Sequence, residues 1–317
     1  MKTDVFFLKR QQAIIIFLGF CILFSCKSNT DKEEPHFSSK KRIVYNTEAM
    51  EILGPDTLSS GWNTIEYVNS SNETHFIVFE KYPEGKSVVD TKAEVFPVFD
   101  KGMTLINEGN TTAGYKAFDS LPSWYFDVII TGGVGLTAPQ SSSKSTIKLD
   151  PGTYLLECYV KMPNGKFHSV MGMYKEVVVT TEKSLEKEPI PTVTLEISNE
   201  KGIVNTGEVT PGQHIIKVDF LDQKLHEHFL GHDVHLVKLE ANARVDSLAA
   251  WMNWTSSTGL TTPVPNGVIF MGGVEEMPSG NAGFFYANFT PGSYAFIAEV
   301  PAPERKGMLK RFTVNNK

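Results

Sequence analysis

The sequence predicts a mainly β protein made of two tandem β-sandwiches, the first of which contains a helical insertion. Two observations carry this prediction. The segments that begin at Thr131 and Met271 align without a gap at an offset of 140 residues, which indicates two copies of one domain. Short β-rich runs bounded by Gly, Pro, Asn or Asp recur through both copies, a pattern typical of sandwich strands.

The repeat sets the expected domain boundaries. Both copies contain "GGV" and a later "PG" followed by Tyr, and they end alike, with "GMYKEVVV" against "GMLKRFTV". Upstream, "ETHFIVFEK" matches "DVHLVKLEA". We therefore expect domains at 46–182 and 192–317. The charged, Pro-containing residues 183–191 between them indicate a linker.

The N-terminus predicts export and a lipid anchor. A charged start and the apolar run "AIIIFLGFCILF" indicate a signal peptide over residues 1–25, and the run is shorter than the roughly 20 residues of a membrane span. "LFSC" resembles a bacterial lipobox, which implies lipidation of Cys26; a simple secretory signal is the alternative. Residues 26–45 are charged and aperiodic, which predicts a disordered tether. We expect a cell-envelope protein held at the membrane through Cys26.

Charge and cysteine content narrow the possible partners. The formal net charge of −6 becomes −8 when the signal peptide, with three basic residues and one acidic residue, is removed. An acidic chain argues against nucleic acid as a partner. Of three cysteines, Cys21 leaves with the signal and Cys26 would be acylated, so Cys158 has no disulfide partner. A lone thiol in an exported protein persists best when it is buried or bound to a metal.

Five runs in the first copy are the expected strands: "WNTIEYVN", "THFIVFE", "STIKLD", "TYLLECYV" and "KEVVVT". Strand alternation places Cys158 on the same side as Leu156, and His75 on the same side as Ile77. Both chemically interesting residues therefore lie on the more apolar face of their strand.

The helical insertion is predicted in "VVDTKAEVFPVFDKGMTLINEG". Apolar residues recur there at helical spacing: Val95, Phe99, Met103 and Ile106. Pro97 is expected to break or start a helix, and Gly109 to end it. Between its shared His and its Gly-Gly, the first copy is 20 residues longer than the second.

Three motifs of the first copy resemble those of cupredoxins, the small copper-binding Greek-key sandwiches. "GWNTIEYVNSSNETHF" is similar to their early strand and first His ligand. "PGTYLLEC" is similar to the penultimate strand with its Cys, and "HSVMGM" to the final His and Met. The resemblance covers residues 61–79 and 132–179. It implies that the Greek-key topology applies to both copies.

The resemblance also implies a site for one copper ion in the first domain. His75, Cys158 and His168 would be the equatorial ligands, and Met173 the weak axial ligand. Met171 is an alternative axial ligand, because strand alternation puts it on the same side as Met173. Nine residues separate Cys158 from His168, more than in plastocyanin-like members. A thiolate, two imidazoles and a distant thioether suit copper that cycles between Cu(I) and Cu(II).

The second copy is expected to lack this centre. Ala298 stands where Cys158 does, and the loop "EVPAPERKG" contains no His. Only His235 and Met308 remain at matching positions. The second domain is therefore interpreted as a degenerate, cupredoxin-like domain.

Enzyme chemistry is not favoured by the sequence. Two-domain nitrite reductases and laccases need further His ligands beside the copper Cys, and the neighbours here are Glu157 and Tyr159. One complication is "HEHFLGHDVH", in which four histidines from His226 to His235 could hold copper or zinc. His226 and His228 would point the same way in a strand, and a polar loop followed by an edge strand is the favoured interpretation.

Two functional hypotheses follow. The first is a lipid-anchored copper protein that transfers electrons or handles copper, with a redox or copper-exchange protein as partner. The second is a metal-free pair of sandwiches that binds a protein or ligand at the cell envelope.

Overall fold

The computed structural model describes residues 42–316, so the predicted signal peptide and Cys26 lie outside the described residues. Strand β1 (Ile43–Thr47) begins inside the range expected for the tether. Burial explains the difference, because the Tyr45 ring is fully buried and its hydroxyl donates a hydrogen bond to the Pro55 carbonyl oxygen at 3.0 Å. The folded part of the first copy therefore includes these residues.

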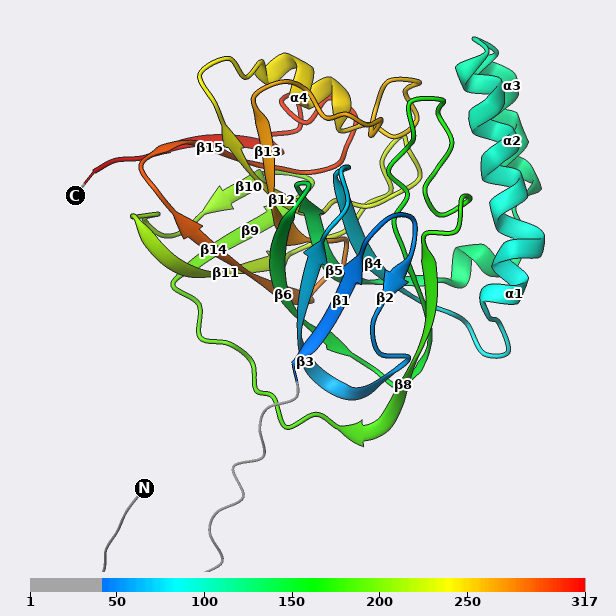
Figure 1. Ribbon diagram of the computed structural model, residues 1–317, viewed down its shortest axis with the longest axis horizontal. Helices are drawn as coiled ribbons and strands as arrows, with labels where there is room; N and C mark the ends of the chain where they lie inside the picture. Colours follow the sequence, from blue (N-terminus) through cyan, green and yellow to red (C-terminus); the bar gives the residue numbers. More distant parts are fainter. Residues whose placement is uncertain (1–41, 317) are drawn as a thin grey trace, which may run out of the picture. The chain divides into compact units, whose positions relative to one another are not determined.

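The first copy is built mainly from strands, as predicted (Figure 1). After β1 they are β2 (Ile52–Leu53), β3 (Thr57–Asn69), β4 (His75–Lys81), β5 (Ile129–Thr137), β6 (Ser141–Leu149), β7 (Gly152–Glu157) and β8 (Tyr174–Lys183). Strand β3 pairs antiparallel with β6 and, through its first residues, parallel with β8. Strand β3 is therefore part of both layers of the sandwich. One layer contains β1, β3 and β6, and the other contains β8, β7, β4 and β5.

The second copy repeats this arrangement. Its strands are β9 (Val193–Ser198), β10 (Gly202–Asn205), β11 (Gly212–Phe220), β12 (Val234–Leu239), β13 (Val268–Val274), β14 (Ala282–Phe289), β15 (Gly292–Ile297) and β16 (Leu309–Val314). Strands β12 to β16 correspond to β4 to β8. The copies are joined by pairing of β14 with β6 and of β13 with β5. Residues 42–316 consequently form one unit with a shared core.

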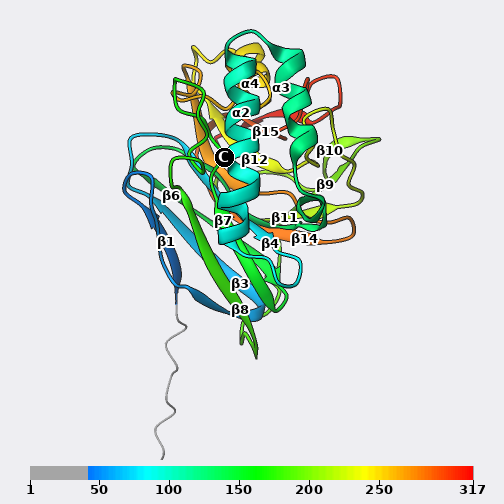
Figure 2. The same ribbon diagram turned by 90° about the vertical axis from the view of Figure 1, so that its right-hand side faces the viewer.

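The helical insertion lies between β4 and β5. It consists of α1 (Val88–Asp90), a π-helical turn η1 (Thr91–Val95), α2 (Phe96–Asn107), α3 (Thr111–Ala117) and the 3₁₀ turns η2 (Phe118–Ser120) and η3 (Ser123–Asp127). Pro97 lies in the first turn of α2, directly after the π-helical turn η1. Gly109 has a φ of +86°, a left-handed conformation that suits the end of α2. Figures 1 and 2 show α1, α2 and α3 standing together on one side of the strands.

The second copy carries a shorter helix, α4 (Val245–Trp251), at the corresponding place in its chain order. Three of its residues, Leu248, Ala249 and Trp251, are buried. The residues after α4 reach back toward the first copy, and Trp254 packs against Phe99 of α2 with ring centroids 5.9 Å apart. The two insertions therefore meet beside the sheets.

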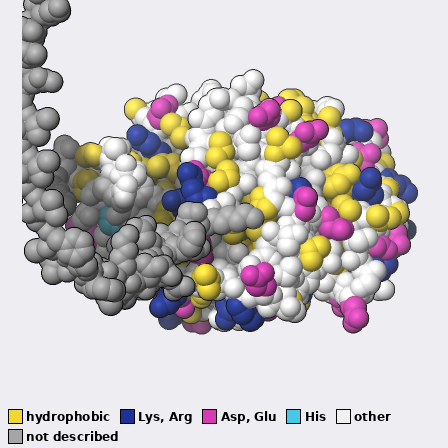
Figure 3. All heavy atoms as spheres, turned by 60° about the horizontal axis from the view of Figure 1, so that its bottom comes forward, with side chains coloured by type: hydrophobic (Ala, Val, Ile, Leu, Met, Phe, Trp, Pro, Cys, Tyr) yellow, Lys and Arg dark blue, Asp and Glu magenta, His cyan; other side chains and the backbone are white. Residues whose placement is uncertain are grey.

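The surface is mixed in charge. Figure 3 shows basic and acidic side chains interspersed with apolar ones over the visible face. Across residues 42–316, every helix is too short or too polar to cross a membrane.

Candidate metal centre

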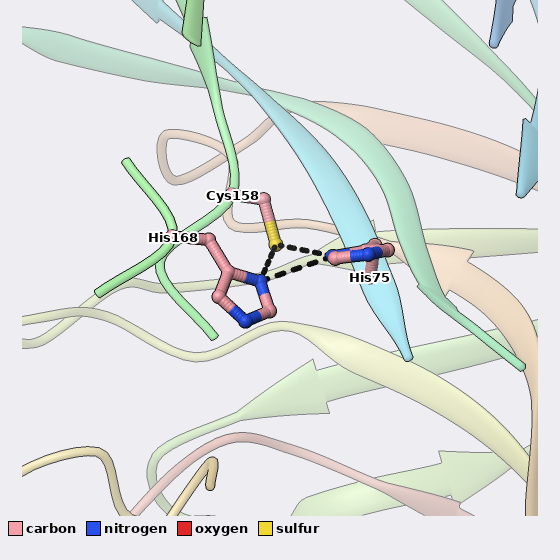
Figure 4. Close-up of side chains that lie close together, drawn as sticks. All are labelled: His75, Cys158 and His168. Atoms are coloured by element: carbon pink, nitrogen blue, oxygen red, sulfur yellow. Dashed lines mark hydrogen bonds between the residues drawn. The ribbon is translucent and has the colours of Figure 1, made fainter. Parts of the chain in front are cut away.

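Three side chains from separate segments converge inside the first copy (Figure 4). His75 is the first residue of β4, Cys158 directly follows β7, and His168 lies in the turn before β8. Cys158 Sγ lies 3.6 Å from His75 Nδ1 and 3.8 Å from His168 Nδ1, and the two Nδ1 atoms are 3.1 Å apart. All three side chains are fully buried.

The three ligand atoms fit a single metal ion. A point in the plane of Cys158 Sγ and the two Nδ1 atoms lies about 2 Å from each of them, close to the usual length of a metal–imidazole bond. The thiol has one proton to offer, so it can donate a hydrogen bond to only one of the two imidazoles. A buried His₂Cys set in a trigonal arrangement matches the chemistry of a type 1-like copper site.

Burial keeps both imidazoles neutral. It lowers the pKa of His75 to about 4. It also lowers the pKa of His168 to about 3, with repulsion from His75 as the smaller cause. Burial raises the pKa of the Cys158 thiol. The metal-free centre therefore holds neutral ligands at neutral pH, and a metal that binds the sulfur must displace the thiol proton.

Glu73 lies beside the nitrogen of His168 that faces away from the centre. Its carboxylate oxygen Oε2 lies 3.2 Å from His168 Nε2. A proton on Nε2 is favoured there because it faces a carboxylate, which leaves the Nδ1 lone pair directed at Cys158. Among the described residues neither His75 Nε2 nor His168 Nε2 makes a hydrogen bond, so the contact between Glu73 and His168 is electrostatic.

The structure separates the two candidate methionines. Met173 is fully buried, whereas Met171 is 46 % exposed. The backbone of Met173 is hydrogen-bonded to both ends of the ligand loop, the segment from Cys158 to His168. Its N–H donates to the His168 carbonyl, and its carbonyl accepts from the Cys158 N–H. Residues 168–173 form turns rather than a strand, so the alternation that put Met171 and Met173 on one side does not apply. Burial beside the ligand loop favours Met173.

Two details of the strand prediction were wrong. Strand β7 ends at Glu157, so Cys158 lies just outside it rather than within it. The predicted polar side of β7 is also largely buried, since Leu155 and Glu157 are 2 % and 9 % exposed. The reason is that the insertion and the second copy cover a surface that would face solvent in an isolated sandwich.

Lys161 ties the ligand loop to the second copy, a role that the sequence did not reveal. Its side chain is fully buried, and Nζ donates hydrogen bonds to the carbonyl oxygens of Trp254 at 2.8 Å and Ser256 at 2.5 Å. Its backbone N–H donates to the Leu260 carbonyl at 2.6 Å. Burial lowers the pKa of Lys161 to about 7. The loop between Cys158 and His168 is thus fixed by contacts with the other copy.

The second copy shows how the same fold position serves a structural role. Ala298, at the position of Cys158, is fully buried. His235, at the position of His75, accepts a hydrogen bond from the Leu136 N–H at Nδ1 (3.1 Å) and donates from Nε2 to Asp233 (2.8 Å). Asp233, His235 and Glu275 form a second buried group of possible ligands, but both nitrogens of its imidazole are already engaged.

The other three histidines of the cluster do not share one centre with His235. His226 and His228 lie in a loop, as in the favoured interpretation, and both are buried. The strand that follows, β12, is not an edge strand, because it pairs with β13 on one side and β15 on the other. His226 Nε2 is 3.4 Å from His232 Nδ1, while His228 Nε2 donates to the Glu299 carbonyl at 2.6 Å. The buried loop instead packs against the first copy and lines part of a cavity described below.

Fold and site together define a cupredoxin-like chain of two copies, with a His₂Cys centre in the first. No protein-family model matches the chain, and no curated protein matches it. Among solved structures it is similar to a reduced auracyanin from Roseiflexus castenholzii, with 22 % identity over 44 % of this chain and 96 % of that one (TM-score 0.27). It is also similar to auracyanin A, a "blue" copper protein from Chloroflexus aurantiacus, with 21 % identity over 44 % and 98 % (TM-score 0.27).

A longer match includes both copies. A Cu-containing nitrite reductase from Thermus scotoductus is 11 % identical over 87 % of this chain and 61 % of its own length (TM-score 0.21). The assignment of the metal centre rests on the ligand atoms of this chain and on their distances.

Proposed function

We propose that the protein is an exported, lipid-anchored copper protein that transfers electrons or handles copper through one type 1-like site in the first copy. His75 Nδ1, His168 Nδ1 and Cys158 Sγ would hold the ion, with Met173 as the weak axial ligand. When bound there, copper supplies one-electron redox chemistry. The observation that carries the proposal is the buried triangle of these three ligand atoms.

Electron transfer is favoured over simple storage by how firmly the ligands are held. His75 is the first residue of β4, which pairs with β5 on one side and β7 on the other. Cys158 directly follows β7, which pairs with β4 and β8. The His168 N–H donates to the Val160 carbonyl at 2.8 Å, and Lys161 is anchored on the second copy. A rigid ligand set reorganises little when an electron moves. An electron-transfer protein of the cell envelope is the proposed partner.

The metal content and visible spectrum of residues 27–317 test the function. We expect one copper per chain after reconstitution and an intense sulfur-to-copper charge-transfer band for Cu(II). A stable redox cycle with a measurable potential would support electron transfer. Folded protein that takes up no copper would instead favour the metal-free binding module.

The membrane anchor is tested separately. The full-length protein should partition into detergent and carry a lipid mass on Cys26. The Cys26→Ser variant should remain unprocessed or become soluble. Release of the wild-type protein into the medium without lipid would overturn the anchor but not the copper site.

A further inference from the structure

A cavity of about 340 Å³ lies between the helical insertion and the second copy, beside the metal centre. Its walls are largely aromatic: Phe99 and Phe118 come from the insertion, Phe167 from the ligand loop and Trp254 from the second copy. Their ring centroids lie 5.4 to 5.9 Å apart in neighbouring pairs. Such a chamber can enclose the apolar body of a small molecule.

Its rim is also apolar. Phe126, Leu225 and Phe229 line the cavity although they are 68 %, 66 % and 47 % exposed. Large apolar side chains left in water around a concave site are typical of a binding surface.

Two buried side chains that line this cavity each have one polar atom without a hydrogen-bond partner among the described residues. Glu157 is 9 % exposed, and its Oε2 has no hydrogen-bond partner among the described residues. His228 is fully buried, and its Nε2 must donate to the Glu299 carbonyl, because a carbonyl oxygen only accepts. Its unpartnered Nδ1 is therefore an acceptor. Two acceptors that make no hydrogen bond in a protein interior cost free energy, which a ligand with several donors would recover.

Apart from His228, the side chains of the lining that could carry charge near neutral pH are all carboxylic acids. Glu80, Glu157, Glu276 and Asp119 line the cavity, and no Lys or Arg does so in the described chain. Glu80 is close enough to Glu157 and Glu276 that burial and their negative charge raise its pKa well above the usual value. The raised pKa favours the neutral form of Glu80 in the empty cavity, and a positive charge placed among these carboxyl groups would favour the ionised form.

We infer that this cavity binds a small organic cation with an aromatic or apolar body, a primary amine in particular. The ammonium group would donate hydrogen bonds to Glu157 and His228, and the aromatic walls would enclose the body. An ammonium group carries three hydrogen-bond donors and no acceptor, which complements the unpartnered acceptors Glu157 Oε2 and His228 Nδ1. Aromatic faces add cation–π attraction.

None of the proposed copper ligands is among the described residues that line the cavity, although the cavity adjoins the metal centre. Glu157 precedes Cys158, and Phe167 and Ser169 flank His168. Binding should therefore occur in the metal-free protein, so that loss of the copper function would leave the inference standing. In copper-loaded protein we expect an occupied cavity to shift the visible spectrum.

The test compares two probes of the same skeleton, phenethylammonium and 2-phenylethanol, in metal-free residues 27–317. Binding is measured by calorimetry and by quenching of tryptophan fluorescence, since Trp124 and Trp254 both line the cavity. We expect the cation to bind at least about tenfold more tightly, the factor that corresponds to about 1.4 kcal/mol. Glu157→Gln keeps the side-chain shape and should abolish most of this preference. Asp127→Asn is the matched control, because Asp127 is exposed and is not among the residues that line the cavity.

A second variant protects the test against a folding defect. Leu121→Trp would fill the cavity without touching the carboxyl groups, and it should reduce binding of both probes. Thermal unfolding of each variant shows that it is folded. Equal affinity for the two probes, or binding unchanged in both Glu157→Gln and Leu121→Trp, would overturn the inference.

Discussion

The ammonium group of Lys161, in the loop that carries the metal ligand His168, donates a hydrogen bond to the backbone carbonyl of Trp254 in the second copy, at 2.8 Å. The cation is fully buried, and its contacts are neutral carbonyl groups. A copy that has lost its own metal ligands thus holds the ligand loop of the other copy in place.

This contact predicts a pH dependence of stability. The folded-state pKa of Lys161 is lowered to about 7 from 10.5, so the unfolded chain binds more protons between these values and stability rises with pH. Between about pH 7 and pH 9.5, the free energy of unfolding of the wild-type protein should rise by on the order of 2–3 kcal/mol relative to that of Lys161→Met. Denaturant unfolding of both proteins at the two pH values checks this. A constant difference would contradict the lowered pKa.

Cys158→Ser should abolish the charge-transfer band of the Cu(II) protein. The band needs a thiolate, and Cys158 is the only cysteine left once residues 1–26 are removed. The fold should survive, because the side chains are similar in size and burying the hydroxyl costs about 1–3 kcal/mol. Visible spectroscopy and circular dichroism measure the two effects. A retained band would place the thiolate elsewhere.

Met173→Leu should keep copper bound but raise its reduction potential. The axial thioether tunes the metal more than it holds it, and an apolar replacement favours the less charged Cu(I). Met171→Leu is the matched control, since Met171 is 46 % exposed and should leave the potential unchanged. Voltammetry of both variants decides between them. The reverse result would make Met171 the axial ligand.

Glu73→Gln should weaken copper binding by about 10- to 100-fold, the usual effect of removing a partner that orients a ligand imidazole. Glu73 acts as a positioning residue through His168 Nε2, 3.2 Å away. Competition with a chelator measures the affinity. The exposed Glu51→Gln serves as control, and an equal effect in both variants would exclude a specific role for Glu73.

Ala298→Cys in a Cys158→Ser background should not create a coloured copper site. His235 already uses both ring nitrogens on Leu136 and Asp233. The absorption spectrum of the double variant with Cu(II) checks this. An intense thiolate band would mean that the second copy can release His235 to a metal.

Local patterns in the sequence were sufficient for the fold and for much of the site. Strands can be recognised from the alternation of apolar and polar residues and from the Gly and Pro residues that bound them. Because the same pattern occurs in both copies, the two sandwiches were predicted correctly. The His75, Cys158 and His168 motifs could also be located, because they resemble those of cupredoxins; strand patterns alone did not identify these residues as ligands. Their convergence within 3.8 Å of one another is a property of the folded chain.

Tertiary structure alone decided what surrounds these residues. Periodicity describes one element at a time, so it could not show that Lys161 would be buried on the other copy or that Met171 would stay exposed while Met173 is covered. Nor could it place Glu157 and His228 on one cavity, 71 positions apart in the chain. Burial, and with it the pKa of a group and its need for a partner, depends on atoms that other segments supply. The sequence therefore determined the strands and the ligand types, and the packing of the two copies decided the environment in which they act.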